Sequence, residues 1–324
     1  MPYDKTVILP VDPDTAFDLI TQPKRLRRWK TVAARVDLKL GGEYRWTITP
    51  GYSAMGSITQ IEPGKSIVYS WGWDGSTDLP PGATKVTVTL EPVPGGTSVR
   101  LVHEGLTDEQ IPPHAAGWDH YLDRLVQYAT TGDAGADPWA AAPEHLNELT
   151  SAEAVLSIAQ RVLRSVENSD LHLSTPCSEF NLAQLIDHQY ESVVHIAESL
   201  GVHAPANPSS SFEIRLADLA QTTMETFSHR GLEGSLRLGS TDLPANVVAN
   251  ILNVELLVHA LDISDSTNQK LDVSPVLAEY VLGLTRKTIS PQGRQSGLFG
   301  EEVAVGDSEE SISRLLAFTG RKYK

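Results

Sequence analysis

The stretch that most constrains the fold is residues 244–264, PANVVANILNVELLVHALDIS, which is long and apolar enough for one buried helix. At about 100° per residue its apolar side chains leave no clean polar face, as is typical of a helix inside a core. Three polar residues, Glu255, His259 and Asp262, nevertheless fall on one side of this helix. A carboxylate and an imidazole buried together are costly unless they are paired or bind a metal. The segment therefore predicts a helical domain with a polar site in its core.

Composition limits the class of protein. The chain of 324 residues is long enough for about two domains, and its net charge of −15 argues against a nucleic acid or an anionic membrane as partner. No apolar run reaches the roughly 20 residues of a membrane-spanning helix and no signal-peptide pattern opens the chain, so we expect a cytoplasmic protein. The single cysteine, Cys177, excludes an internal disulfide and a cysteine-rich zinc site. A metal would need His and carboxylate ligands. The oligomeric state stays open.

Two unlike units are expected. All six tryptophans lie in the first 139 residues, and residues 132–143, GDAGADPWAAAP, have the composition of a linker. No internal repeat crosses this segment. We therefore place a first domain at residues 1–135, a linker at 136–147 and a second domain at 148–324.

The first domain has the pattern of an antiparallel sheet. A strand at residues 6–9 and a short helix capped by Asp12 open it, and a long helix over 108–128 closes it. Between them, turn signals containing Gly and Pro separate strand-like runs at residues 43–49, 56–61, 67–73, 84–90 and 98–103. Many strands closed by one long helix predict an α+β unit, with the helix packed across a curved sheet.

Residues 3–130 resemble the START/SRPBCC superfamily, in its activator-of-heat-shock-ATPase-homologue-like branch. The resemblance lies in VDPDTAFDLITQPKRLRRW, LGGEYRW, GSITQIEPGKSIVYSWGW and HAAGWDHYLDRL. It implies a helix-grip fold with a cavity between sheet and helix, and hence a small hydrophobic ligand. The candidate cavity side chains are Trp46, Trp71, Trp73, Trp118 and Tyr121. Core packing is the alternative interpretation of these aromatic residues.

The second domain is helical by periodicity. Helices are expected over residues 151–166, 182–200, 212–229, 244–264 and 273–288. Ser151 is the expected cap of the first, and Asn181 with Gln184 forms a capping box for the second. Four principal helices predict an all-α four-helix bundle with a site in its core.

Spacing gives the outline of a metal site. Glu255 and His259 supply two ligands one helical turn apart, and a catalytic zinc-type site needs a third protein ligand and an open position. The third ligand must come from another helix. His188 is the best candidate, and His195, seven residues later on the same face, is its rival. A Glu–His hydrogen bond without metal is the alternative interpretation.

A second resemblance concerns the helical domain. TPCSEFNLAQLIDH, the downstream NVELLVHALDI and the closing LFGEEVAV and RLLAFTGR are similar to the actinobacterial branch of the mycothiol-dependent maleylpyruvate isomerase/DinB-like metalloproteins. The resemblance spans residues 148–322 and implies that His188, Glu255 and His259 hold a divalent, zinc-like metal. Asp262 would support His259, or else form a helix-end hydrogen bond. The implied chemistry is metal activation of a low-molecular-weight thiol, with mycothiol as the co-substrate attacking an electrophilic ligand.

Two function hypotheses follow. The first is a metal-dependent, thiol-using transferase or isomerase with an attached domain for a hydrophobic ligand. The second is a non-catalytic two-domain binding protein whose metal is structural or vestigial, which a fourth protein ligand would favour. Cys177 is interpreted as a buried or capping residue rather than a nucleophile, and Arg294 and Arg321 as surface residues rather than groups that bind an acidic substrate.

Overall fold

The computed structural model describes residues 2–209, 211–295, 299–306 and 309–321. The chain divides into two compact units, Met1–Asp137 and Pro138–Lys324, each with its own hydrophobic core. The boundary lies within the small-residue segment expected to be a linker. Leu298 of the closing LFGEEVAV motif lies outside the described residues.

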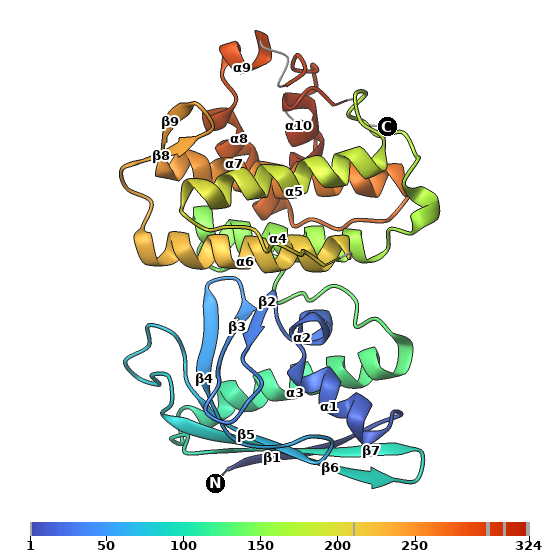
Figure 1. Ribbon diagram of the computed structural model, residues 1–324, viewed down its shortest axis with the longest axis vertical. Helices are drawn as coiled ribbons and strands as arrows, with labels where there is room; N and C mark the ends of the chain where they lie inside the picture. Colours follow the sequence, from blue (N-terminus) through green and yellow to red (C-terminus); the bar gives the residue numbers. More distant parts are fainter. Residues whose placement is uncertain (1, 210, 296–298, 307–308, 322–324) are drawn as a thin grey trace. The chain divides into compact units, whose positions relative to one another are not determined.

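The first unit is built on one antiparallel sheet of seven strands in the order β1-β7-β6-β5-β4-β3-β2. Figure 1 shows this sheet curving around a long helix, α3 (Ile111–Thr131). The strands are β1 (Tyr3–Leu9), β2 (Ala33–Val36), β3 (Glu43–Thr49), β4 (Tyr52–Glu62), β5 (Ser66–Trp71), β6 (Thr84–Val93) and β7 (Gly96–Glu104). The expected helix-grip arrangement of sheet and closing helix is confirmed.

Local chemistry explains where the helices of this unit begin and end. The Asp12 side chain accepts the backbone N–H of Thr15 at 2.9 Å and so caps α1 (Pro13–Thr21), as the sequence predicts. Gly132, with φ of 82°, ends α3 in the left-handed conformation that favours glycine. Helix α2 (Pro23–Trp29) and strand β2 were not predicted, because basic side chains interrupt the apolar pattern of residues 23–36.

The second unit is helical, which confirms the predicted class. Helix α7 (Ala245–Ser266) packs against α4, α5 and α8, and α4 and α5 also pack against α6. The helices are α4 (Glu148–Arg164), α5 (Leu182–Ser199), α6 (Phe212–Arg230), α7, α8 (Pro275–Thr288), α9 (Pro291–Gln295) and α10 (Ser311–Phe318). Within the described residues, α7 alone is long and apolar enough to cross a membrane by length and composition, but most of it is buried in the core of its unit.

Capping interactions fix the ends of the helices around α7. The predicted capping box of α5 is confirmed, with Asn181 and Gln184 exchanging hydrogen bonds of 3.0 Å. The predicted cap of α4 is wrong: Asn147, not Ser151, accepts the backbone N–H groups of Leu149 and Thr150. The hairpin of β8 (Ser235–Leu238) and β9 (Thr241–Pro244) was also missed. Its strands are only four residues long and carry little alternation.

Candidate functional site

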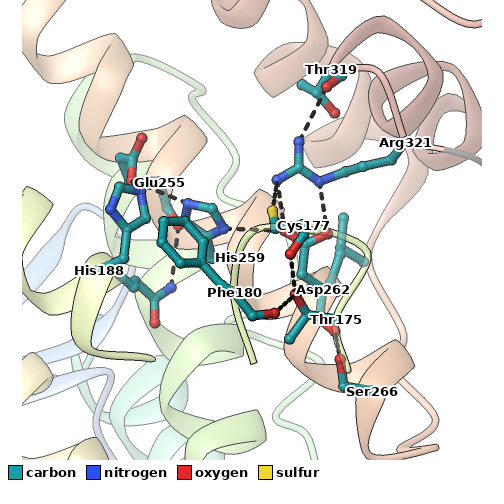
Figure 2. A network of polar contacts seen from close by, with 12 residues as sticks. Thr175, Cys177, Phe180, His188, Glu255, His259, Asp262, Ser266, Thr319 and Arg321 are labelled. Atoms are coloured by element: carbon teal, nitrogen blue, oxygen red, sulfur yellow. Dashed lines mark hydrogen bonds and ion pairs between the residues drawn. The ribbon is translucent and has the colours of Figure 1, made fainter. Parts of the chain in front are cut away.

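A cluster of three possible metal ligands joins α5 to α7. His188 lies on α5, Glu255 and His259 lie on α7, and one ligand atom from each comes within 4.8 Å of the other two. The Oε2 atom of Glu255 is 3.3 Å from Nε2 of His259 and 3.9 Å from Nε2 of His188. Figure 2 shows both imidazole rings beside this carboxylate. The structure thus brings together the three residues that the sequence proposed, and their role as ligands stays a prediction.

Packing around His188 fixes its position against α7. The neighbouring Gln189 is buried and donates from Nε2 to the main-chain oxygens of Glu255 and Leu256 at 3.2 and 3.3 Å. These bonds tie α5 to the turn of α7 that carries the carboxylate. Phe180 stacks on the His188 ring with centroids 5.0 Å apart. The rival candidate His195 is 68% exposed beside Glu198 and lies outside the cluster.

The other edge of His259 is held by a buried carboxylate. Its Nδ1 lies 3.1 Å from Oδ2 of Asp262, whose own side chain is 1% exposed. Arg321 donates from Nε and Nη2 to the two oxygens of Asp262, both at 2.7 Å, and from Nη2 to the sulfur of Cys177 at 3.0 Å. Figure 2 shows this chain of contacts from Arg321 to His259. The predicted surface position of Arg321 is therefore wrong, because a buried anion holds it inside.

Cys177 and Arg294, which the sequence left without a functional role, also have hydrogen-bond partners. Cys177 is partly buried, and its Sγ donates to Oδ2 of Asp262 at 3.4 Å. Arg294 donates to the main-chain oxygens of Gly300 and Phe318, so it is a structural group of the C-terminal segment. The contact of Cys177 with Asp262 cannot be deduced from spacing, because it joins segments far apart in the chain.

Electrostatics in this cluster favour an ionised, paired network. Burial raises the pKa of Asp262, but hydrogen bonds from His259 and Arg321 outweigh it and lower that pKa to about 2. Burial lowers the pKa of His259, yet its bonds to Asp262, Cys177 and Glu255 raise it well above the usual value. Burial likewise opposes ionisation of Glu255, while its contacts with His259 bring the pKa below the usual range. These directions describe an ionised Glu255 carboxylate beside a protonated His259.

Two overlapping donor sets could hold a metal ion, and His259 belongs to both. The set of Cys177, His259 and Asp262 already contacts the Arg321 guanidinium, whose positive charge opposes a second cation. Among the described residues, no lysine or arginine is in hydrogen-bond contact with His188 or Glu255, although the charge of Arg321 also helps to lower the pKa of His188. Within the described residues, Oε2 of Glu255 is buried and meets no donor in good hydrogen-bond geometry. Two imidazoles and one such carboxylate fit a zinc-type ion.

The cluster opens into a cavity. Its volume is about 690 Å³, and it is lined by all three candidate ligands together with Cys177, Ser192 and Arg321. This is within the size range of small-molecule sites. The arrangement therefore places a possible metal ion where a small molecule could reach it.

The first unit contains a separate cavity of about 540 Å³. Four of the five expected aromatic residues line it: Trp71, Trp73, Trp118 and Tyr121. Trp46 instead packs behind this wall, with its ring 6.2 Å from that of Trp71. Lys30 and His114, which the sequence did not suggest, also line the cavity.

A buried histidine connects the sheet to α3 beside this cavity. The indole N–H of Trp118 donates to Nδ1 of His103 at 3.0 Å, so Nε2 carries the proton and donates to Oγ1 of Thr84 at 2.9 Å. Burial, with smaller repulsions from His114 and Lys30, lowers the pKa of His103 to about 3. The ring is therefore a neutral structural group at physiological pH.

The sheet, the closing helix and the internal cavity define the first unit as a helix-grip domain. Residues 10–130 match the family model described as Activator of Hsp90 ATPase homolog 1-like protein. The N-terminal unit is accordingly an AHSA1-like domain.

Relatives and solved structures cover parts of the chain. The uncharacterized protein Rv0738 of Mycobacterium tuberculosis H37Rv is 28% identical over 167 residues, which are 49% of this chain and 90% of that protein. An AHSA1-like protein of Rhizobium etli is 36% identical, covering 45% of this chain and 91% of its own, with a TM-score of 0.37. The structure of DynU16, a putative protein in the dynemicin biosynthetic locus, is 20% identical with a TM-score of 0.39. That match covers 43% of this chain and half of DynU16.

Proposed function

We propose that the helical unit is a DinB-like four-helix bundle that binds a divalent, zinc-like metal through His188, Glu255 and His259. The protein would use this ion to activate a low-molecular-weight thiol of the mycothiol type, as a transferase or isomerase acting on an electrophilic ligand. The observation that carries the proposal is the convergence of three donor atoms from two helices on the wall of a 690 Å³ cavity. The similarity to a Mycobacterium tuberculosis protein agrees with the actinobacterial resemblance of the sequence.

A bound divalent ion would lower the pKa of a thiol that coordinates it. The chain's own residues do the rest. Asp262 accepts the Nδ1 proton of His259, which leaves Nε2 of that ring as the ligand atom. Arg321 donates to both oxygens of Asp262, which balances the carboxylate charge and keeps the group in place.

The AHSA1-like unit supports the second half of the proposal, the binding of a hydrophobic ligand. Its cavity is walled by indole and phenol rings and is large enough for a small apolar molecule. Trp46 packs in the core and does not line the cavity, whereas Trp73 and Trp118 line it, and Trp118 also belongs to the core.

The alternative hypothesis, a structural or vestigial metal, has less support. A closed structural zinc site uses four protein ligands, whereas a catalytic one uses three. Among the described residues, the donor set around Glu255 has three members. The further candidate donors, Cys177 and Asp262, contact each other and Arg321 on the Nδ1 side of His259.

Cobalt substitution tests the thiol step apart from metal binding. Metal-free protein would be loaded with Co²⁺ and titrated with a low-molecular-weight thiol while its visible and near-ultraviolet absorption is followed. The proposal predicts that a thiolate-to-cobalt band appears and saturates, and that Glu255→Gln gives no such band. If the protein binds cobalt but its spectrum does not change at saturating thiol, the proposed thiol role is wrong and the proposed metal site is unaffected.

A further inference from the structure

Lys30 is a buried cation that lines the cavity of the AHSA1-like unit. It follows the last residue of α2, and only 4% of its surface is exposed. A lysine that is buried without a partner is rare, because removing the ammonium group from water is costly. No pattern in the sequence singles out Lys30, which ends a run of basic residues over positions 24–30.

Aromatic rings surround the amine of Lys30. Its Nζ lies 4.1 Å from the ring centroid of Trp46, 4.5 Å from that of Trp118 and 5.3 Å from that of Trp71. Such faces attract a cation, but they leave its hydrogen-bond donors without acceptors. Burial also pushes the pKa of Lys30 well below its usual value.

Two indole N–H donors beside Lys30 lack acceptors, and the carboxylate in the cavity wall is already paired. Within the described part of the chain, the contacts found for Nζ of Lys30 are with indole rings, and the buried indole N–H groups of Trp46 and Trp71 lack hydrogen-bond partners. Asp74 lines the same cavity, but its carboxylate is paired with Arg45. His114 accepts the indole N–H of Trp73 at 3.2 Å and donates from Nδ1 to the Gln110 carbonyl.

We propose that Lys30 is the recognition group of this cavity and that its ligand is an apolar carboxylic acid, whose carboxylate pairs with Nζ while its hydrocarbon part packs against Trp71, Trp73 and Trp118. The inference rests on the proposed ligand role of the AHSA1-like unit and deepens it. A carboxylate supplies both the missing negative charge and the missing acceptors. An ion pair formed away from water also gains strength from the low local dielectric.

The cavity fits such a molecule in size and character. Its volume of about 540 Å³ accepts a medium-chain or aromatic acid, and aromatic rings, Ile48 and Pro113 supply apolar wall, with Asp74 and Ser76 as further polar groups. A neutral apolar molecule of the same shape would gain the same burial but would leave Nζ unpaired. The two kinds of ligand therefore differ only in the carboxylate that would pair with Nζ of Lys30.

Calorimetric titration of the full chain with octanoate and with 1-octanol tests this. The two probes share their hydrocarbon tail and differ at the head group. The wild type should bind octanoate at least about tenfold more tightly than 1-octanol, in keeping with a charge-assisted hydrogen bond. Lys30→Met should remove that preference and leave 1-octanol binding within about twofold, since the apolar wall is intact. Lys65→Met is the matched control, because Lys65 is an exposed residue paired with Glu62.

The possible results separate this inference from the broader ligand role. If both probes bind equally to the wild type, or if Lys30→Met keeps the preference for octanoate, Lys30 does not read a carboxylate and the apolar cavity alone stands. If neither probe binds, the inference and the ligand role of the AHSA1-like unit both fail. Retained binding of 1-octanol by Lys30→Met shows that the variant is folded.

Discussion

Nε2 of His188 lies 3.9 Å from Oε2 of Glu255, although the two residues belong to different helices. This proximity explains why an apolar core helix can carry a carboxylate. The charge of Glu255 faces one imidazole from its own helix and another from α5, and all three groups reach a cavity. The polar residues of α7 therefore form one wall of a candidate site rather than a defect in a core.

Cys177→Ser should leave zinc affinity within about twofold of the wild type. Its sulfur contacts Arg321 and Asp262, on the edge of His259 that faces away from Glu255. Competition with a chelating dye measures the affinity directly. A loss of about 100-fold, comparable with losing a ligand or its support, would instead place the metal in the set of Cys177, His259 and Asp262.

Zinc should stabilise the helical unit, and Glu255→Gln should remove that effect. A ligand present at about 100 times its dissociation constant adds about 2.7 kcal/mol to the stability of the state that binds it. Thermal unfolding with zinc and with a chelator, followed by circular dichroism at helix wavelengths, gives the difference. Equal zinc-induced shifts in the wild type and in the Gln variant would show that Glu255 is not a ligand.

Asp262→Asn should destabilise the helical unit by about 3 kcal/mol, because Arg321 would remain buried without its counter-charge. It should also weaken zinc binding about tenfold, through the loss of the group that orients His259. Denaturant unfolding and metal titration measure the two effects separately.

The double variant Asp262→Asn with Arg321→Met separates these two roles. Stability should return toward the wild-type value, because no buried charge is left unpaired, while zinc affinity should stay low. Recovery of both properties together would mean that Asp262 acts on the metal site only through the fold.

Acid should destabilise the AHSA1-like unit through His103. Its pKa is about 3 in the folded state and about 6.5 in the unfolded state, so the unfolded chain binds more protons between these values. Stability is therefore complete above about pH 6.5 and falls as the pH is lowered, by on the order of 3 kcal/mol at pH 4. Protonation would also place a donor on Nδ1 against the indole N–H of Trp118.

Tryptophan emission during denaturant unfolding at pH 7 and pH 4 checks this, because five of the six tryptophans lie in the first unit. His103→Gln keeps polar atoms in the site but does not titrate, so its stability should depend less on pH. An unchanged pH dependence in that variant would assign the acid sensitivity to other groups.

Periodicity predicted most of the architecture because the elements bury regular faces. The six expected strands correspond to β1 and β3–β7, the closing helix corresponds to α3, and residues 244–264 fall within α7 and its cap. Helix α2 and strand β8 were not predicted, because charged residues interrupt the apolar pattern of α2 and β8 is very short. Helix ends were predicted where a side-chain cap was unambiguous, as for Asn181.

The candidate metal ligands could be named from the sequence because Glu255 and His259 share one helix, and because position and the resemblance both favoured His188 as the third. Arg321 and Lys30 could not, since each is held by partners from distant segments: Asp262 for the first and three indole rings for the second. Both are cations that composition alone assigns to the surface. Their burial is a property of tertiary packing, which no local pattern encodes.

The most direct test of the central claim is the metal content of the full chain purified without chelators. Elemental analysis should find about one equivalent of a divalent, zinc-like metal in the wild type and in His195→Ala, since His195 is exposed and outside the cluster. His188→Ala and His259→Ala should each lose it. A wild type without stoichiometric metal, or loss of metal from His195→Ala but not from His188→Ala, would contradict a metal centre of His188, Glu255 and His259.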